Sequence, residues 1–198
     1  MMKILVVNSS GRYHNSVSRM LTKTLLEKIQ SVVYETEVIE RDLMKTELPF
    51  VNEQMIGGLY IPERQRTQEQ KSALTISDSL AQELIDADVL IFGLPIYNFT
   101  IPGAFKSYLD LVCRAGLTFQ YTQAGPIGLL KNKQAYAIVT SGGTELGGPV
   151  DYSTRYLQHV MAFIGIEDLE VIAADRLLFG SKAKIESALR HINSIELN

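Results

Sequence analysis

The sequence predicts an open α/β fold, a doubly wound, five-stranded parallel sheet with strand order 2-1-3-4-5 and helices on both faces. Its 198 residues suffice for one domain with a full core, so we expect residues 1–198 to form a single domain. Short apolar runs, typical of strands buried on both faces, alternate with segments of helical periodicity. Right-handed crossovers then make the doubly wound arrangement the simplest topology.

Short apolar runs mark the expected strands, and the second run is the weakest. The others have the length of ordinary strands and are rich in Val, Ile and Leu, as buried parallel strands are. The runs are Ile4–Val7, Glu37–Ile39, Asp88–Gly93, Ala135–Thr140 and Leu169–Ala174.

Segments with helical spacing follow these runs. In the first such segment, Leu21, Leu25 and Ile29 recur at intervals of four and therefore share one face of a helix. The expected helices are Ser18–Ile29, Gln68–Ile85, Ala104–Val112, Ser153–Ile164 and Lys182–Ile195.

Two connections are too long for a minimal β-α unit. The segment Leu43–Arg66 contains two prolines and a pair of adjacent glycines, so we expect a long excursion with a short helix. The segment Leu117–Leu130 predicts a hairpin arm closed by Ala124-Gly125-Pro126. Connections of this length in compact domains are usually functional or disordered.

The composition argues against several classes of protein. Hydrophobic residues make up 46% and charged residues 21%, as in globular domains, and no stretch is long and apolar enough to span a bilayer. The first strand lacks the features of a signal peptide, so we expect a cytoplasmic protein. A net charge of −3 without a Lys/Arg stripe argues against nucleic acid as a partner. The single cysteine, Cys113, lies in an apolar helical stretch where we expect it to pack, and no His/Cys cluster has metal-ligand spacing.

The loops after the first, third and fourth strands form the candidate site, because ligands of open α/β sheets bind beyond the carboxyl ends of the strands. Residues 8–18 are rich in hydroxyls and run into a helix N-terminus, which suits a phosphate group held by neutral donors. The motifs of P-loop and dinucleotide sites are absent. Taken alone, this loop is explained somewhat better by an ordinary N-cap at Ser16 or Ser18 than by phosphate binding.

The other two loops extend this pattern. After the third strand, Pro95 and Pro102 bracket Tyr97-Asn98-Phe99, a turn that presents amides and an aromatic face to a planar heterocycle. After the fourth strand, residues 140–149 contain four glycines, which let backbone N–H groups approach a ligand. For the loop after the third strand, the alternative is a rigid turn with partly buried aromatic rings. For the loop after the fourth strand, the alternative is a flexible lid.

Together these residues resemble the FMN-dependent NADH azoreductases, also described as NAD(P)H quinone oxidoreductases, which have a flavodoxin-like fold. The resemblance covers nearly the whole chain and implies a homodimer that binds FMN at the subunit interface and uses NADH or NADPH as co-substrate. It rests on Ser9-Ser10, Ser16-Val17-Ser18, Pro95 to Phe99 with Ile101-Pro102, Arg114 to Phe119, Gly125-Pro126 and Thr140 to Gly143.

The resemblance implies a role for each loop. The first holds the phosphate and ribityl end of FMN, the second lines the isoalloxazine, and the third covers its other edge. Phe119 and Phe163 are candidates to shape the substrate cleft, in their own chain or across the dimer, with core packing as the alternative. The family often has arginine where this chain has Ser141, so a fixed cation is missing from the third loop. The implied cofactor-binding residues are Ser10, Ser16, Val17, Ser18, Ile96, Tyr97, Asn98, Phe99, Thr140, Ser141, Gly142 and Gly143.

The expected function is that of an FMN-dependent oxidoreductase that transfers hydride from NADH or NADPH to quinones and aromatic azo compounds in a ping-pong cycle. Because the flavin carries the chemistry, we expect no catalytic side chain. A flavodoxin-like electron carrier without a small-molecule substrate is the alternative, although the insert Leu117–Leu130 favours an enzyme. A receiver domain needs acidic residues after its first strand, where this chain has Asn8 and Ser9.

Overall fold

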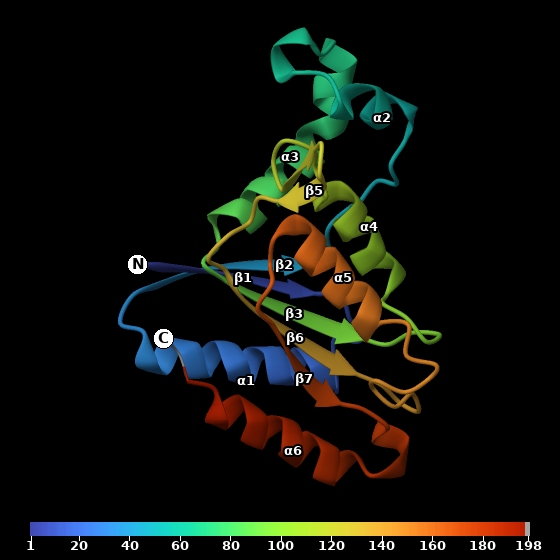
Figure 1. The fold of residues 1–198 in the computed structure, drawn as a ribbon. Helices are drawn as coiled ribbons and strands as arrows, with labels where there is room; N and C mark the ends of the chain where they lie inside the picture. Colours follow the sequence, from blue (N-terminus) through green and yellow to red (C-terminus); the bar gives the residue numbers. More distant parts are fainter. Residues whose placement is uncertain (197–198) are drawn as a thin grey trace.

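The computed structural model describes residues 1–196, so the last two residues of the predicted domain lie outside the described part. Its main sheet has five parallel strands in the order β2-β1-β3-β6-β7 (Figure 1), which confirms the predicted order. Each predicted apolar run overlaps one strand. The strands are β1 (Met2–Asn8), β2 (Thr36–Asp42), β3 (Val89–Pro95), β6 (Gln134–Thr140) and β7 (Leu169–Ala174).

Helices cover both faces of this sheet, as the sequence predicts. Figure 1 shows α1 and α6 together on one face, and α3, α4 and α5 on the other. The predicted helices agree with the observed ones to within three residues at each end. They are α1 (Val17–Val32), α3 (Gln68–Asp86), α4 (Gly103–Val112), α5 (Thr154–Ile164) and α6 (Ser181–Ser194).

The two hydrophobic cores follow from the alternation of side chains along the strands. In β1, Leu5 and Val7 belong to the core that α3, α4 and α5 cover, whereas Ile4 and Val6 belong to the core beneath α1 and α6. All of β3 is buried in the middle of the sheet, which explains its continuous apolar run. β2 is an edge strand whose residues are only half-buried or exposed, so its apolar run in the sequence is short.

The long excursion after β2 contains the expected short helix. This helix, α2 (Glu53–Leu59), is followed by a 3-10 turn, η1 (Glu63–Gln65), and then by the capped start of α3, where Thr67 and Gln70 form a capping box. Figure 1 shows α2 and the first turns of α3 standing clear of the main sheet.

The predicted hairpin arm is present, but its turn consists of Gln123 and Ala124 and not of Ala124-Gly125-Pro126. β4 (Phe119–Thr122) pairs antiparallel with β5 (Gly125–Gly128), so Gly125 and Pro126 belong to a strand and not to the turn. The Thr122 hydroxyl closes the turn by donating to the Gly125 carbonyl at 2.7 Å and accepting from the Ala124 N–H at 3.2 Å. Proline is tolerated here because a two-stranded ribbon consists of edge strands only.

Candidate cofactor site

Two adjoining pockets lie at the carboxyl ends of the strands, and together they are lined by all twelve predicted cofactor-binding residues. The first pocket, of about 260 Å³, also contains Arg12, Asn15, Pro95, Leu177 and Leu178. The predicted residues that line it are Ser10, Ser16, Val17, Ser18, Ile96, Tyr97, Thr140, Ser141 and Gly142. The second pocket, of about 300 Å³, shares Ile96, Ser141 and Gly142 with the first and adds Asn98, Phe99, Gly143 and Thr144.

Hydroxyl groups converge at the positive end of α1. The Ser16 hydroxyl donates to Ser10 Oγ at 3.0 Å and lies 3.3 Å from Ser18 Oγ. Ser16 is also the N-cap, but the bond it accepts from the Arg19 N–H is long, at 3.4 Å. The first N–H groups of a helix have no partner within it, so the amides of Val17 and Ser18 add two further donors. The loop therefore combines a weak cap with a cluster of neutral donors suited to a phosphate group.

An ion pair that the sequence pattern did not predict supports this loop. Arg19 donates to both carboxylate oxygens of Asp42, at 2.8 and 2.9 Å, and to the Ser10 carbonyl at 2.7 Å. Burial raises the pKa of Asp42, but the bonds from Arg19 and the Met44 N–H outweigh it and hold that pKa below 3.8. The sequence contained one signal for this pair. Arg19 lies in the first turn of α1, where a positive charge interacts unfavourably with the helix dipole, and an anionic partner offsets that interaction.

The second loop is a tight turn with an unusual backbone. Tyr97 and Thr100 exchange backbone hydrogen bonds of 3.0 and 3.2 Å, and the two residues between them, Asn98 and Phe99, have φ values of +48° and +73°. Two positive φ values define a type I′ turn, which asparagine tolerates and phenylalanine rarely adopts. The Tyr97 hydroxyl accepts from the Gly11 N–H at 3.1 Å and so links the first and second loops.

The third loop is held in place by two carboxylates. Asp151 accepts from the Gly147 N–H at 2.9 Å while also bonding the start of α5, and Asp175 accepts from the Leu146 N–H at 2.9 Å. Burial raises the pKa of each carboxyl. The hydrogen bond from the Thr154 hydroxyl and the backbone bonds outweigh burial at Asp151, and the bond and charge of Lys184 together with the Leu146 N–H outweigh it at Asp175, so the pKa of each carboxyl lies below its ordinary value. Both groups therefore stay ionised and bonded at neutral pH. The loop is anchored near its middle, which disfavours the alternative of a flexible lid.

Ser141, at the position where the resemblance leads one to expect arginine, has a local structural role. Its hydroxyl donates to the Thr144 carbonyl and accepts from the Arg176 N–H at 3.1 Å. These bonds tie the third loop to the segment after β7. Two residues of that segment, Leu177 and Leu178, line the first pocket and were not predicted.

Phe119 and Phe163 lie outside both pockets. Their ring centroids are 4.4 Å apart, and Phe119 is only 6% exposed. They pack where the β4-β5 hairpin meets α5, so in this chain they contribute to the hydrophobic packing. Their role in a substrate cleft remains a prediction.

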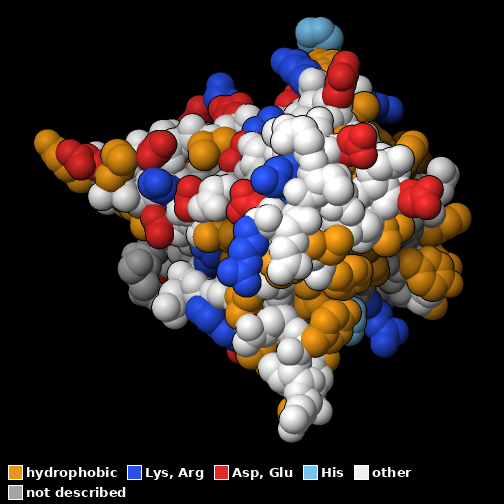
Figure 2. Space-filling model, turned by 90° about the horizontal axis from the view of Figure 1, so that it is seen from above, with side chains coloured by type: hydrophobic (Ala, Val, Ile, Leu, Met, Phe, Trp, Pro, Cys, Tyr) orange, Lys and Arg blue, Asp and Glu red, His pale blue; other side chains and the backbone are white. Residues whose placement is uncertain are grey.

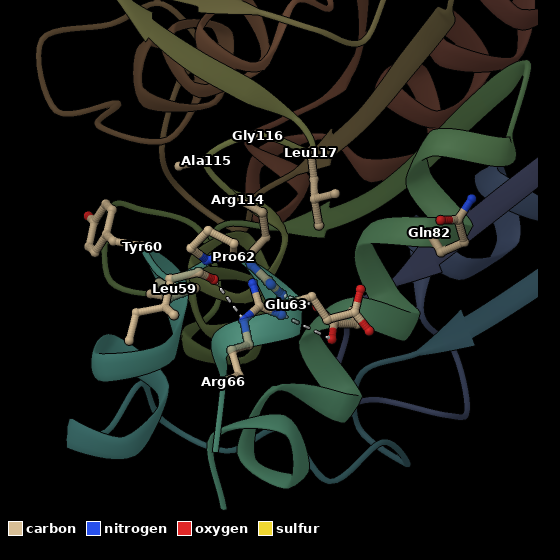
Figure 3. Close-up of a pocket in the computed structure, with 12 residues that line it drawn as sticks. Leu59, Tyr60, Pro62, Glu63, Arg66, Gln82, Arg114, Ala115, Gly116 and Leu117 are labelled. Atoms are coloured by element: carbon tan, nitrogen blue, oxygen red, sulfur yellow. Dashed lines mark hydrogen bonds and ion pairs between the residues drawn. The ribbon is translucent and has the colours of Figure 1, made fainter. Parts of the chain in front are cut away.

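A larger pocket, of about 620 Å³, lies between the α2-η1 connection, α3 and the loop after α4 (Figure 3). Its arginines already have partners. Arg66 Nε donates to one backbone carbonyl in the last turn of α2 and to another in the connection after it. Arg114 donates to Ser77 Oγ at 2.6 Å and Asp78 at 2.7 Å. Arg114, from the Arg-Ala-Gly motif, therefore connects the loop after α4 to α3. None of the predicted site residues lines this pocket.

Burial raises the pKa of the Cys113 thiol to about 12, so it stays protonated at neutral pH. Within residues 1–196, no group of His, Cys, Asp and Glu is arranged to hold a metal ion. In the same residues, no helix has both the length and the apolar character of a membrane span.

Comparison with known proteins shows what this chain is similar to. Residues 2–195 match the family model for the flavodoxin-like fold. A protein from Hahella chejuensis, described as FMN-dependent NADH:quinone oxidoreductase 1, is 42% identical over 190 residues, which are 96% of this chain and 93% of that protein. A protein of the same description from Jannaschia sp. is 43% identical and covers 98% of this chain and 99% of its own length.

Solved structures give the same result. An azoreductase from Bacillus anthracis has a TM-score of 0.89 and 30% identity, over 97% of both chains. An FMN-dependent NADH-azoreductase from the same organism, solved in complex with FMN, has a TM-score of 0.86 and 25% identity, over 97% of this chain and 96% of the other. The chain therefore belongs to the family of FMN-dependent NADH:quinone oxidoreductases.

Proposed function

We propose that this protein binds FMN in the two adjoining pockets and transfers hydride from NADH or NADPH to quinones and aromatic azo compounds. The observation that carries the proposal is the convergence of three loops, far apart in the sequence, on one edge of the sheet. The full-length relatives described as FMN-dependent NADH:quinone oxidoreductases support it.

The residues present fit FMN. The clustered hydroxyls of Ser10, Ser16 and Ser18 and the N-terminus of α1 would hold the phosphate group with neutral donors. The Tyr97–Thr100 turn and the glycine loop would hold the ring system from two sides, with the N–H groups of the glycines close to its polar rim. Because both loops are already fixed by hydrogen bonds, little conformational entropy is lost on binding.

FMN, when bound, supplies the hydride-transfer chemistry. The chain's own part is to position the cofactor and substrates and to limit access of water. Because the chemistry comes from FMN, the site needs no acid, base or nucleophile from the chain. The residues that line the pockets accordingly supply hydroxyls, amides and glycines, with no histidine, cysteine or carboxylate among them.

We further propose that the protein works in the cytoplasm as a homodimer with FMN at the subunit interface. Large apolar side chains are exposed on the α2 side, among them Phe50 and Tyr60, and in the pocket lining, among them Phe99. Figure 2 shows hydrophobic side chains gathered to one side of the face seen from above. Exposed apolar patches often mark sites of protein association. In such a dimer, Phe119 and Phe163 would shape the cleft over the partner's cofactor.

The visible absorption spectrum of the purified protein tests the proposal. We expect a yellow protein with flavin absorption, or an apoprotein that retains added FMN, and parallel double-reciprocal lines when NADH and quinone are both varied. The same sample should sediment as a dimer. A protein that does not retain FMN contradicts the proposal. Bound FMN without NADH oxidation by quinones would favour the electron carrier.

Replacing Asn98 with alanine is expected to weaken FMN binding about tenfold or to slow its reduction by NADH. The variant loses the amide and forces alanine into a left-handed conformation, which costs about 1–2 kcal/mol. Asn98→Gly is the control because glycine accepts the turn without strain. Equal losses of FMN affinity or reduction rate in both variants would show that the side-chain amide of Asn98 is responsible. A loss in Asn98→Ala alone would show that the turn conformation is responsible. Wild-type behaviour of both would remove Asn98 from the site.

A further inference from the structure

The segment after β7, residues 175–180, runs beside the glycine loop and forms a wall of the first pocket that no prediction included. The Leu177 N–H donates to the Ser141 carbonyl at 3.0 Å, and the Leu178 N–H donates to the Gly142 carbonyl at 3.0 Å. Both leucines line the pocket. Two successive backbone hydrogen bonds therefore hold this wall against the glycine loop, which the cofactor is expected to contact.

The wall contains an exposed apolar side chain, Leu178, and its backbone adopts uncommon conformations on both sides of this residue. Leu178 is 79% exposed although it belongs to a pocket lining. It lies between Arg176, with φ of +52°, and Gly180, with φ of +150°. A left-handed backbone at a non-glycine residue is maintained only where the surroundings enforce it, and such residues gather at ligand sites. The arrangement presents Leu178 at the mouth of the pocket.

Gly142 lies opposite Leu178. A Cβ atom at Gly142 would lie 3.4 Å from Leu178 Cδ1 and 3.5 Å from Leu178 Cγ, which is ordinary van der Waals contact. The two residues are therefore neighbours in the lining of the pocket. The opposite end of the pocket carries the serine hydroxyls, so the pocket has a polar end for a phosphate group and an apolar wall beside Gly142.

We propose that Leu178 contacts the cofactor and that its side chain packs against the ring system of FMN. A planar heterocycle carries apolar faces beside its polar rim, and covering both the ring and an exposed leucine removes apolar surface from water. The inference rests on the proposed binding of FMN. It makes Leu178 a determinant of cofactor affinity.

Titration of the apoprotein with FMN, followed by flavin fluorescence, tests the role of Leu178. Leu178→Ala should raise the dissociation constant about tenfold, because part of a buried leucine contact is lost. Val32→Ala is the matched control: Val32 is an aliphatic residue 63% exposed at the far end of α1, and its loss should leave the constant unchanged. A wild type that binds FMN together with an unchanged Leu178→Ala overturns this inference alone. A wild type that binds no FMN overturns the proposed function as well.

Discussion

Replacing Ser16 with aspartate should weaken FMN binding by about a hundredfold or more, while leaving α1 as stable as before. The new carboxylate would lie where the hydroxyls of Ser10 and Ser18 converge, and would face the phosphate group. Two like charges about 4 Å apart repel by roughly 4 kcal/mol at an effective dielectric constant of about 20, and each 1.4 kcal/mol is a factor of about ten in affinity. Aspartate is as good an N-cap as serine and suits the helix dipole, so the helix itself keeps its cap.

Ser16→Asn is the matched control, because asparagine also caps helices but carries no charge. Fluorescence titration with FMN and a thermal unfolding curve should be recorded for both variants. If Ser16→Asp binds FMN as tightly as Ser16→Asn, no phosphate group lies at this helix end, and the serine is only the N-cap that the sequence also allowed.

Replacing Gly128 with alanine should lower the free energy of unfolding by about 4 kcal/mol or more, the range of severe core substitutions. A methyl group at this position would overlap the backbone of Ile164 and Gly165, where the hairpin crosses the end of α5. Gly165 has φ of +101° and ends α5, so neither backbone can move aside without breaking the helix end or the Leu130–Ile164 hydrogen bond.

Urea unfolding monitored by circular dichroism measures this loss. Gly103→Ala is the control, because a Cβ atom at Gly103, the first residue of α4, would meet no atom within 4 Å. That substitution should be neutral or slightly stabilising, since alanine favours helices and narrows the unfolded ensemble. Equal unfolding midpoints for the two variants would show that the hairpin does not depend on close backbone contact with α5.

Most of the fold could be predicted because the signals are local. A strand buried on both faces, such as β3, must be continuously apolar, and a helix such as α1 must place its leucines on one face. The hairpin turn was placed wrongly because Gly125 and Pro126 have turn propensity. The Thr122 hydroxyl, which closes the turn at Gln123 and Ala124, leaves no comparable signal.

The sequence by itself determined the β-α order of this protein, and it predicted the edge of the sheet where the two pockets lie and three of the segments that line them. Only the tertiary structure decided what supports those loops. Arg19 and Asp42 belong to different elements, and Leu178 lies far along the chain from Gly142. Such pairs leave no periodic pattern, because they depend on which loops the sheet brings side by side. The strand order explains both, since β1 adjoins β2 and β6 adjoins β7.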